Sequence, residues 1–229
     1  MKKRYRFRPS RRTMLAGLAA SSALSAAAPR VAFAAVPSEP ATALAFDGGD
    51  LLLAAAGIWR SEDGGATWSE LSAGPSRSVT ALATHPDRPG RILAAMEMGG
   101  VAASEGGGAT WARRGAGLPE AAATALAADA HQPDALYVAV AGDGLWQSED
   151  AAATWSFAID RPWLDDAEHD VLALASVGSL SGMGGIWVYA GTAAGLIRVP
   201  DCFCRWQDVQ AGNAMDALAA GEAPAPERP

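Results

Sequence analysis

The sequence predicts an all-β fold that is built from repeats of one four-stranded unit. An eight-residue phrase, Ser-Glu-Asp-Gly-Gly-Ala-Thr-Trp at residues 61–68, returns in altered form at residues 104–111 and 148–155. These box segments start 43 and then 44 residues apart. A fixed period of this size is typical of chains that stack copies of one supersecondary unit. Short apolar runs bounded by Gly, Pro and Asp lie between the box segments, and such runs indicate strands joined by turns.

Each unit is expected to hold four strands. The phrase Ala-Leu-Ala leads the units at residues 43–45, 81–83, 125–127 and 173–175, and it returns at 217–219. An apolar run such as residues 135–140 follows this phrase. A Gly and a second apolar run come next and lead into the box segment, and a last strand follows the box segment. About 40–45 residues and four strands per repeat are typical of a propeller blade. The sequence therefore predicts an all-β β-propeller of about four readable four-stranded blades.

The fourth unit carries a degenerate box segment at residues 199–206. When Gly195 is aligned with Gly144, Asp201 and Trp206 are five residues apart, which is also the spacing of Asp and Trp in the third box segment. Two cysteines and a phenylalanine stand where the other box segments have small residues. We therefore expect a fourth blade with an irregular turn.

The pattern S-x-D-x-G-x-T-W resembles the Asp-box, or BNR repeat, of sialidase-like β-propellers, which include non-enzymatic Ycf48-like and sortilin-like proteins. The resemblance covers residues 43–209 and implies a hairpin turn in which the Asp side chain accepts hydrogen bonds from backbone N–H groups just downstream. Gly106 replaces that Asp in the second box segment, so its turn is expected to be the looser one. The resemblance implies structural roles for Ser61, Asp63, Thr67, Trp68, Ser104, Thr110, Trp111, Ser148, Asp150, Thr154, Trp155, Asp201 and Trp206. The four Trp residues are expected in equivalent, largely buried positions.

The number of units leaves the closure of the ring open. Sialidase-like propellers normally have six or more blades, whereas four units are readable here. The fifth Ala-Leu-Ala phrase, residues 217–219, either completes the first blade as a latch strand or begins a fifth blade. In the second case an open edge remains, and a protein partner or a homo-oligomer would cover it.

Residues 1–34 are predicted to be an export signal. A basic start without acidic residues, a weakly apolar run and a small-x-small site ending at Ala34 form the usual three-part pattern. Arg11 and Arg12 resemble a twin-arginine signal, which implies folding before export to the periplasm or the outside of a bacterial or archaeal cell. The alternative is a Sec signal with an arginine-rich start. The expected boundaries are 1–34 for the signal, 35–220 for the propeller and 221–229 for a disordered tail.

Charge limits the class of partner. Residues 1–34 contain eight of the 18 Lys and Arg residues and no acidic residue. The remainder of the chain therefore has ten basic and 25 acidic residues, which gives it a net charge of −15. Nucleic acid binding is disfavoured at that charge. The remainder has no long apolar run that predicts a transmembrane segment. We expect a protein partner and no cofactor.

Cys202 and Cys204, the only cysteines, allow three interpretations. They form a disulfide after export, they bind a soft metal such as Cu(I) as a thiolate pair, or they fill the degenerate turn as inert small residues. No His lies at a metal-ligand spacing from them. We predict that neither cysteine is catalytic.

The third unit is longer than the others and holds an acidic insertion. Arg161, Trp163 and His169 lie in it and form a candidate partner-binding loop. The alternatives are a Trp that covers a blade edge and a solvated acidic loop, and a divalent cation site is a further interpretation.

The leading hypothesis is an exported, non-enzymatic propeller that acts as a protein-binding or assembly scaffold. Sialidases use a Tyr nucleophile and three arginines around a carboxylate, and the candidates here are Tyr137, Tyr189 and the segment Ile197–Pro200. That segment aligns with the strand-to-turn part of the fourth unit, so no catalytic residue is assigned. The alternative hypotheses are a glycan-binding or glycoside-hydrolase propeller and a periplasmic copper or redox accessory protein that uses Cys202 and Cys204.

Overall fold

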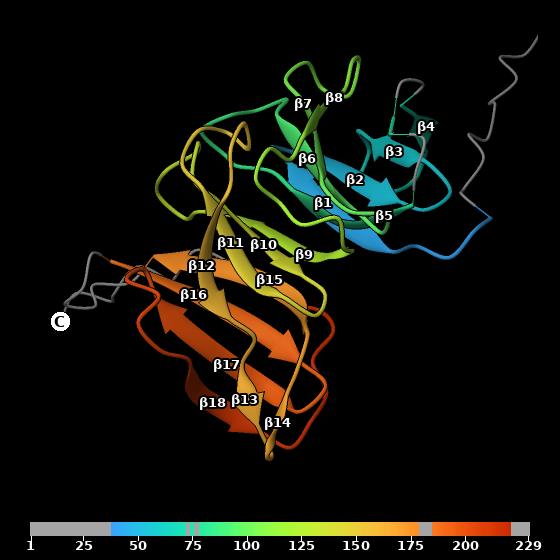
Figure 1. Cartoon of the computed structure of the whole chain (residues 1–229). Coiled ribbons are helices and arrows are strands. Elements are labelled where there is room, and N and C mark those ends of the chain that lie inside the picture. Colours follow the sequence, from blue (N-terminus) through green and yellow to red (C-terminus); the bar gives the residue numbers. More distant parts are fainter. Residues whose placement is uncertain (1–37, 72–73, 76–77, 179–184, 221–229) are drawn as a thin grey trace, which may run out of the picture. The chain divides into compact units, whose positions relative to one another are not determined.

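The computed structural model describes residues 38–71, 74–75, 78–178 and 185–220, which belong to one compact unit. All regular elements in these ranges are β-strands (Figure 1). Their bounds are β1 Ala43–Asp47, β2 Asp50–Ala54, β3 Ile58–Ser61, β4 Ser69–Glu70, β5 Val79–Ala83, β6 Ile92–Met96, β7 Val101–Ser104, β8 Ala112–Arg114, β9 Ala123–Ala128, β10 Leu136–Val140, β11 Gly144–Ser148, β12 Ser156–Asp160, β13 Trp163–Leu164, β14 Ala167–Glu168, β15 Val171–Gly178, β16 Ile186–Thr192, β17 Gly195–Pro200 and β18 Gln207–Ala211. The predicted signal with Arg11 and Arg12, and the tail 221–229, lie outside the described residues.

The strands form four antiparallel sheets of four strands each, and every sheet follows chain order. The sheets are β1-β2-β3-β4, β5-β6-β7-β8, β9-β10-β11-β12 and β15-β16-β17-β18, and β13 and β14 form a separate hairpin. Each sheet corresponds to one sequence unit, and the sheets are arranged as a four-bladed β-propeller. The prediction of the fold class is therefore confirmed.

The Ala-Leu-Ala phrase explains how the blades stack. Successive side chains of a strand point to opposite faces. In β9, Leu126 packs in the core shared with the second blade, whereas Ala125 and Ala127 pack in the core shared with the fourth. We call the side toward the preceding blade the backward face and the side toward the following blade the forward face. The small Ala residues on the forward face leave room for the larger side chains of the next blade.

A threonine before the Ala-Leu-Ala phrase ties neighbouring blades together. The Thr42 hydroxyl donates to the carbonyl of Val79 at 2.6 Å, and the Thr124 hydroxyl donates to that of Val171 at 2.6 Å. The Thr80 hydroxyl makes the same contact with Ala123 in the third blade. The fourth blade has Leu172 at this position, 38% exposed, which cannot donate. The repeated bond thus joins blades one to four and ends there.

The first and fourth blades are the two ends of a row. Cores lie between blades one and two, two and three, and three and four. The consecutive first strands β1, β5, β9 and β15 contact one another in order, whereas no comparable contact joins the first sheet to the fourth among the described residues. Figure 1 shows β1 and β18 in different end blades.

The fifth Ala-Leu-Ala phrase does not complete the first blade. The first sheet consists of β1–β4 alone, and residues 217–219 form no strand. Instead, the Met215 amide donates to the Thr192 carbonyl at 2.8 Å, and the Met215 carbonyl lies where a side chain on Gly191 would be. This segment therefore lies against the fourth blade, as the start of a fifth unit would. The latch-strand alternative is not adopted.

Candidate functional site

A serine hydroxyl closes the turn in each of the first three box segments. Ser61, Ser104 and Ser148 are at most 2% exposed. Their Oγ atoms accept hydrogen bonds from the amides four residues later, at 2.8, 2.9 and 3.0 Å. From the sequence, we expected the Asp side chain to accept the hydrogen bonds of the turn, and the serines were named only as members of the motif. The signal that could have found them is the invariant Ser at the end of the third strand of three units.

The box aspartates add a second clamp. Asp63 accepts hydrogen bonds from the Thr67 amide at 2.8 Å and from its hydroxyl at 2.6 Å, and Asp150 does the same with Thr154 at the same distances. The Thr67 hydroxyl and amide lower the pKa of Asp63 to about 2. The Thr154 contacts likewise lower the pKa of Asp150. Both carboxylates therefore serve the turn, and both are exposed.

The second box segment keeps the backbone of the first without the carboxylate. Gly107 and Gly108 have φ values of 64° and 93°, close to the 71° and 93° of Gly64 and Gly65. The greater looseness predicted for this turn concerns its stability and stays a prediction. In the third box segment the equivalent residues are Ala151 and Ala152, at φ 59° and 66°. That conformation is costly for a residue with a Cβ atom.

The expectation of four largely buried Trp residues is wrong for three of them. Trp155 is 6% exposed, whereas Trp68, Trp111 and Trp206 are half-buried. The indole N–H groups of Trp68 and Trp111 donate to the carbonyls three residues earlier, so their polar edges lie at the turn and stay near solvent. Trp206 donates to the Asp160 carbonyl in the third blade.

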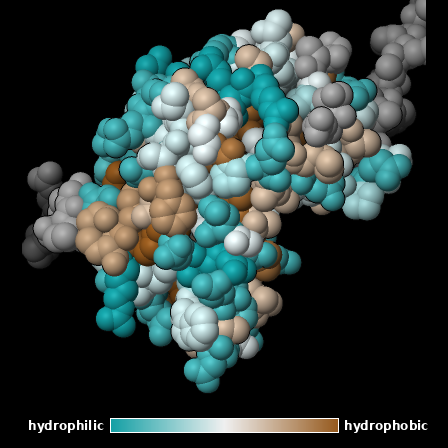
Figure 2. Space-filling model, in the orientation of Figure 1, coloured by the Kyte–Doolittle hydropathy of each residue, from teal (hydrophilic) through white to brown (hydrophobic). Residues whose placement is uncertain are grey.

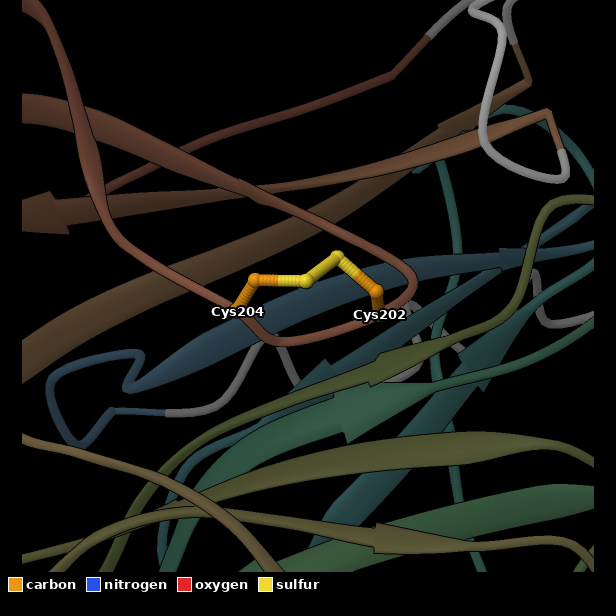
Figure 3. The surroundings of a disulfide bond; sticks show 2 residues. All are labelled: Cys202 and Cys204. Atoms are coloured by element: carbon orange, nitrogen blue, oxygen red, sulfur yellow. A yellow bond between two sulfur atoms is a disulfide. The ribbon is translucent and has the colours of Figure 1, made fainter.

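The degenerate fourth box segment is closed by different means. Cys202 and Cys204 form a disulfide across the turn between β17 and β18 (Figure 3). Phe203 between them has φ 47° and packs against Tyr137 of the third blade, with ring centroids 5.7 Å apart. The disulfide is the first of the three interpretations of this pair. A thiolate site for copper would require its reduction.

The acidic insertion contains the hairpin β13–β14. Asp165 and Asp166 form its two-residue turn, both at positive φ, which is the conformation of a type I′ hairpin. Arg161 makes ion pairs with Glu168 and with Asp170, the latter at 3.5 Å. These contacts hold the base of the hairpin.

The three candidate partner residues of the insertion differ in orientation. Trp163 is 66% exposed, among the most exposed large apolar side chains of the described chain. Arg161 lies beside it in the chain and is half-buried in its ion pairs. The His169 ring nitrogen Nε2 lies 3.1 Å from the Leu164 carbonyl, so this ring braces the hairpin. Among the described residues, no group of three or more His, Cys, Asp or Glu side chains is placed to hold a metal ion.

Tyr137, a candidate for hydrolysis, and Arg60 of the first blade both have structural partners. Tyr137 is 5% exposed and its hydroxyl donates to Asp129 at 2.6 Å. Burial, and then the Asp129 carboxylate, raise the pKa of Tyr137 far above its usual value, which disfavours the phenolate. Arg60 pairs with Asp47 and Asp50 at 2.7 and 2.5 Å. The Arg60 ion pairs connect β3 to β1 and β2 within the first blade.

Arg198, in the segment that suggested a sialidase motif, stacks on Trp187 and contacts the hydroxyl of Tyr189. The guanidinium carbon lies 4.1 Å from the Trp187 ring centroid, and Nη1 lies 3.4 Å from the Tyr189 oxygen. These three residues share the forward face of the fourth blade. The segment is therefore part of a blade surface, as the repeat alignment predicted.

Solved structures that match this chain are β-propellers. The extracellular domain of the putative one component system BT4673 from B. thetaiotaomicron has a TM-score of 0.58 and 14% identity, over 82% of this chain and 26% of that one. YCF48 from Cyanidioschyzon merolae has a TM-score of 0.56 and 14% identity, over 80% and 61%. The GH74 xyloglucanase from Xanthomonas campestris has a TM-score of 0.55 and 18% identity, over 77% and 31%.

These likenesses concern the fold. No protein-family model matches the chain, and no curated protein matches it. The chain covers less than two thirds of the length of each of the three solved structures. In the described part of the chain, no helix is long and apolar enough to cross a membrane.

Proposed function

We propose that this protein is an exported, non-enzymatic β-propeller scaffold that binds a protein partner through the hairpin β13–β14. The observation that carries the proposal is Trp163, a large aromatic side chain that is 66% exposed on a hairpin whose base is held by ion pairs. Figure 2 shows that hydrophobic residues on one face of the molecule form small patches between hydrophilic ones. Among the described residues, Trp163 is the only Trp that is exposed.

The chemistry around Trp163 fits a protein partner. Aromatic residues and arginine are enriched at the centres of protein interfaces, where they contribute most of the binding energy. Asp165, Asp166 and Glu168 lie on the same hairpin as Trp163, and all three are exposed. A partner with an apolar pocket and a basic rim complements this hairpin.

The test is a comparison of Trp163→Ala with Met98→Ala. Met98 is also 66% exposed and lies in the β6–β7 turn, so its replacement removes similar apolar surface elsewhere. Native partners are cross-linked in the cell, identified by mass spectrometry and then titrated as purified proteins. We expect Trp163→Ala to weaken binding at least about tenfold, and Met98→Ala to leave it unchanged. Equal binding by both variants would exclude the hairpin as the partner site.

Two other hypotheses have distinct tests. An exposed Trp is also a stacking surface for sugars, so xyloglucan oligosaccharides should be titrated against the wild type and Trp163→Ala; Trp163-dependent binding would favour the glycan-binding alternative. For the copper or redox alternative, Cys202 and Cys204 are both changed to Ala. We expect unchanged partner binding in that variant, and loss of bound metal or partner would favour the alternative instead.

Export through the twin-arginine route is part of the proposal. Changing Arg11 and Arg12 to Lys should keep the protein in the cytoplasm in a folded state, because that pathway reads the arginine pair. Fractionation and protease resistance measure the two properties. Normal export of the double variant would indicate the Sec route.

A further inference from the structure

Residues 215–219 occupy the position of the first strand of a further blade. Their sequence, Met-Asp-Ala-Leu-Ala, aligns with the segments that begin the second, third and fourth blades, residues 79–83, 123–127 and 171–175. Met215 and Leu218 stand at the two positions that pack on the preceding blade in those units, and both are half-buried. The two residues between them, and Ala219, are exposed. The segment therefore starts a blade on the forward face of the fourth one.

No second strand pairs with this segment in the described part of the chain. In each of the four blades the first strand pairs with an antiparallel second strand. The bond from the Met215 amide to the Thr192 carbonyl is the only backbone hydrogen bond that residues 213–220 make to the described residues. A row of exposed, unpaired amides and carbonyls is a template on which another strand can pair.

The burial of Leu196 shows the effect of the missing second strand. The equivalent residues Ile58, Val101 and Leu145 are 1, 0 and 0% exposed. Each of them shares a core with the first strand of the next blade and with two residues of its second strand, namely Ile92 and Ala94, Leu136 and Val138, or Val188 and Ala190. Leu196 is only half-buried, because residues 215–219 supply the first of those two strands alone.

The repeat specifies the side chains that an added strand must carry. Opposite the first Ala of the Ala-Leu-Ala phrase, the second strand has a small residue in every blade, Ala54, Ala95, Ala139 or Gly191. Opposite the second Ala it has a large one, Leu52, Leu93, Tyr137 or Tyr189. The segment therefore fits an extended peptide of the pattern apolar, Leu or Tyr, apolar, small, as in Ile-Leu-Ala-Ala at residues 92–95.

We propose that residues 215–219 bind an extended apolar segment of a protein partner by strand addition. The partner strand pairs antiparallel with this segment. Its first and third residues pack toward Leu196, as their equivalents do in the three cores of the chain, and its small fourth residue lies opposite Ala217. Backbone hydrogen bonds provide the affinity, and the alternation of side chains provides the specificity. This surface does not use Trp163 and goes beyond the proposed function.

The test uses the full chain and a fluorescent peptide with the sequence of residues 91–97, Arg-Ile-Leu-Ala-Ala-Met-Glu. We expect saturable binding by fluorescence anisotropy. The amides of residues 216–219 should exchange with solvent deuterium at least about tenfold more slowly when the peptide is bound. The control peptide carries the change Ala94→Pro, which removes an amide and disfavours a central strand, so it should not bind.

Proline variants of the chain locate the bound peptide. Adjacent residues of a strand direct their amides to opposite sides, so either Ala217→Pro or Leu218→Pro removes an amide that faces the added strand. That variant should bind the peptide at least about tenfold more weakly. Ala41→Pro, the same change at an exposed residue before β1, should bind like the wild type, and so should Trp163→Ala. Circular dichroism confirms that each variant is folded.

Three results would overturn the proposal. The first is the absence of saturable binding, and the second is binding by both proline variants that equals that of the wild type. The third is slow exchange of amides 216–219 in the free chain. Slow exchange at every protein concentration would mean that another part of the chain covers the segment, and exchange that slows as the concentration rises would mean that a second copy covers it. None of these outcomes depends on Trp163, so they are separate from the test of the proposed function.

Discussion

Replacing Ser148 with Ala should destabilise the propeller through one buried amide. The Ser148 side chain is 2% exposed, and its Oγ accepts from the Ala152 amide at 3.0 Å and donates to Asp150 at 2.9 Å. Ala152 is completely buried in the core between the second and third blades. Without the hydroxyl, the amide of Ala152 loses its acceptor in a place that water does not reach.

The size of the effect follows from the cost of a buried, unsatisfied donor. That cost is about 1–3 kcal/mol, larger than the net value of the hydrogen bond itself. For a domain of this size, each kcal/mol lowers the unfolding temperature by about 2–4 °C. Urea denaturation followed by Trp fluorescence measures the change, because Trp155 lies in the same core and reports its exposure.

Ser156→Ala is the matched control for this measurement. Ser156 lies on β12 of the same blade and is exposed, so its replacement should change the free energy of unfolding by less than about 0.5 kcal/mol. If Ser148→Ala and Ser156→Ala unfold at the same urea concentration and with the same dependence of the free energy of unfolding on urea, the hydrogen bond from the Ala152 amide to the Ser148 hydroxyl does not stabilise the turn. The role assigned to all three box serines would then be wrong.

Three further predictions concern the same turns and the contacts between blades. Ala151→Gly should raise the free energy of unfolding by about 0.5–1 kcal/mol, because glycine adopts a positive φ without the steric cost that alanine has. Ala152→Gly should leave that free energy nearly unchanged in the same urea assay, because the gain at the positive φ is offset by the loss of a buried methyl group. The pKa of Asp63 is lowered to about 2 in the folded state, so the ionised carboxylate stabilises the fold above pH 4, and this stabilisation is lost as the pH falls toward 2. The unfolding temperature of Asp63→Asn should therefore depend less on pH between 4 and 2 than the unfolding temperature of Glu62→Gln. Thr124→Val should cost about 1 kcal/mol through the lost inter-blade hydrogen bond, and unchanged urea unfolding would show that packing alone joins the blades.

Local repetition made the blades predictable from the sequence. The Ala-Leu-Ala phrase alternates small and large side chains at the strand period, so it specifies both a strand and the two faces that it presents. The match of Gly195 to Gly144 placed the fourth blade in register despite its altered box segment, and both glycines adopt similar φ values, 143° and 148°. These features depend on neighbours within one unit, which the sequence contains.

Features that depend on distant neighbours were not predictable. The burial of Trp68 and Trp155 differs although their sequence contexts match, because Trp155 packs in the core between the second and third blades, whereas Trp68 belongs to none of the three cores. The type I′ turn at Asp165 and Asp166 lacks the usual Asn-Gly or Asp-Gly signal. Likewise, Leu44 is 57% exposed because no sheet of the described residues packs on that face of the first blade, which no property of its own strand reveals.

The threonine bonds join each blade only to the next one, so the cooperativity of the monomer is that of a linear array. Opening the first or the fourth blade breaks one interface, whereas opening the second or the third breaks two. Backbone amides of β5–β7 and β9–β11 should therefore exchange with solvent deuterium most slowly, and those of β1–β3 and β16–β18 should exchange earlier. The second and third blades are therefore expected to be the most stable part of the array, and the first and fourth blades are expected to open most readily.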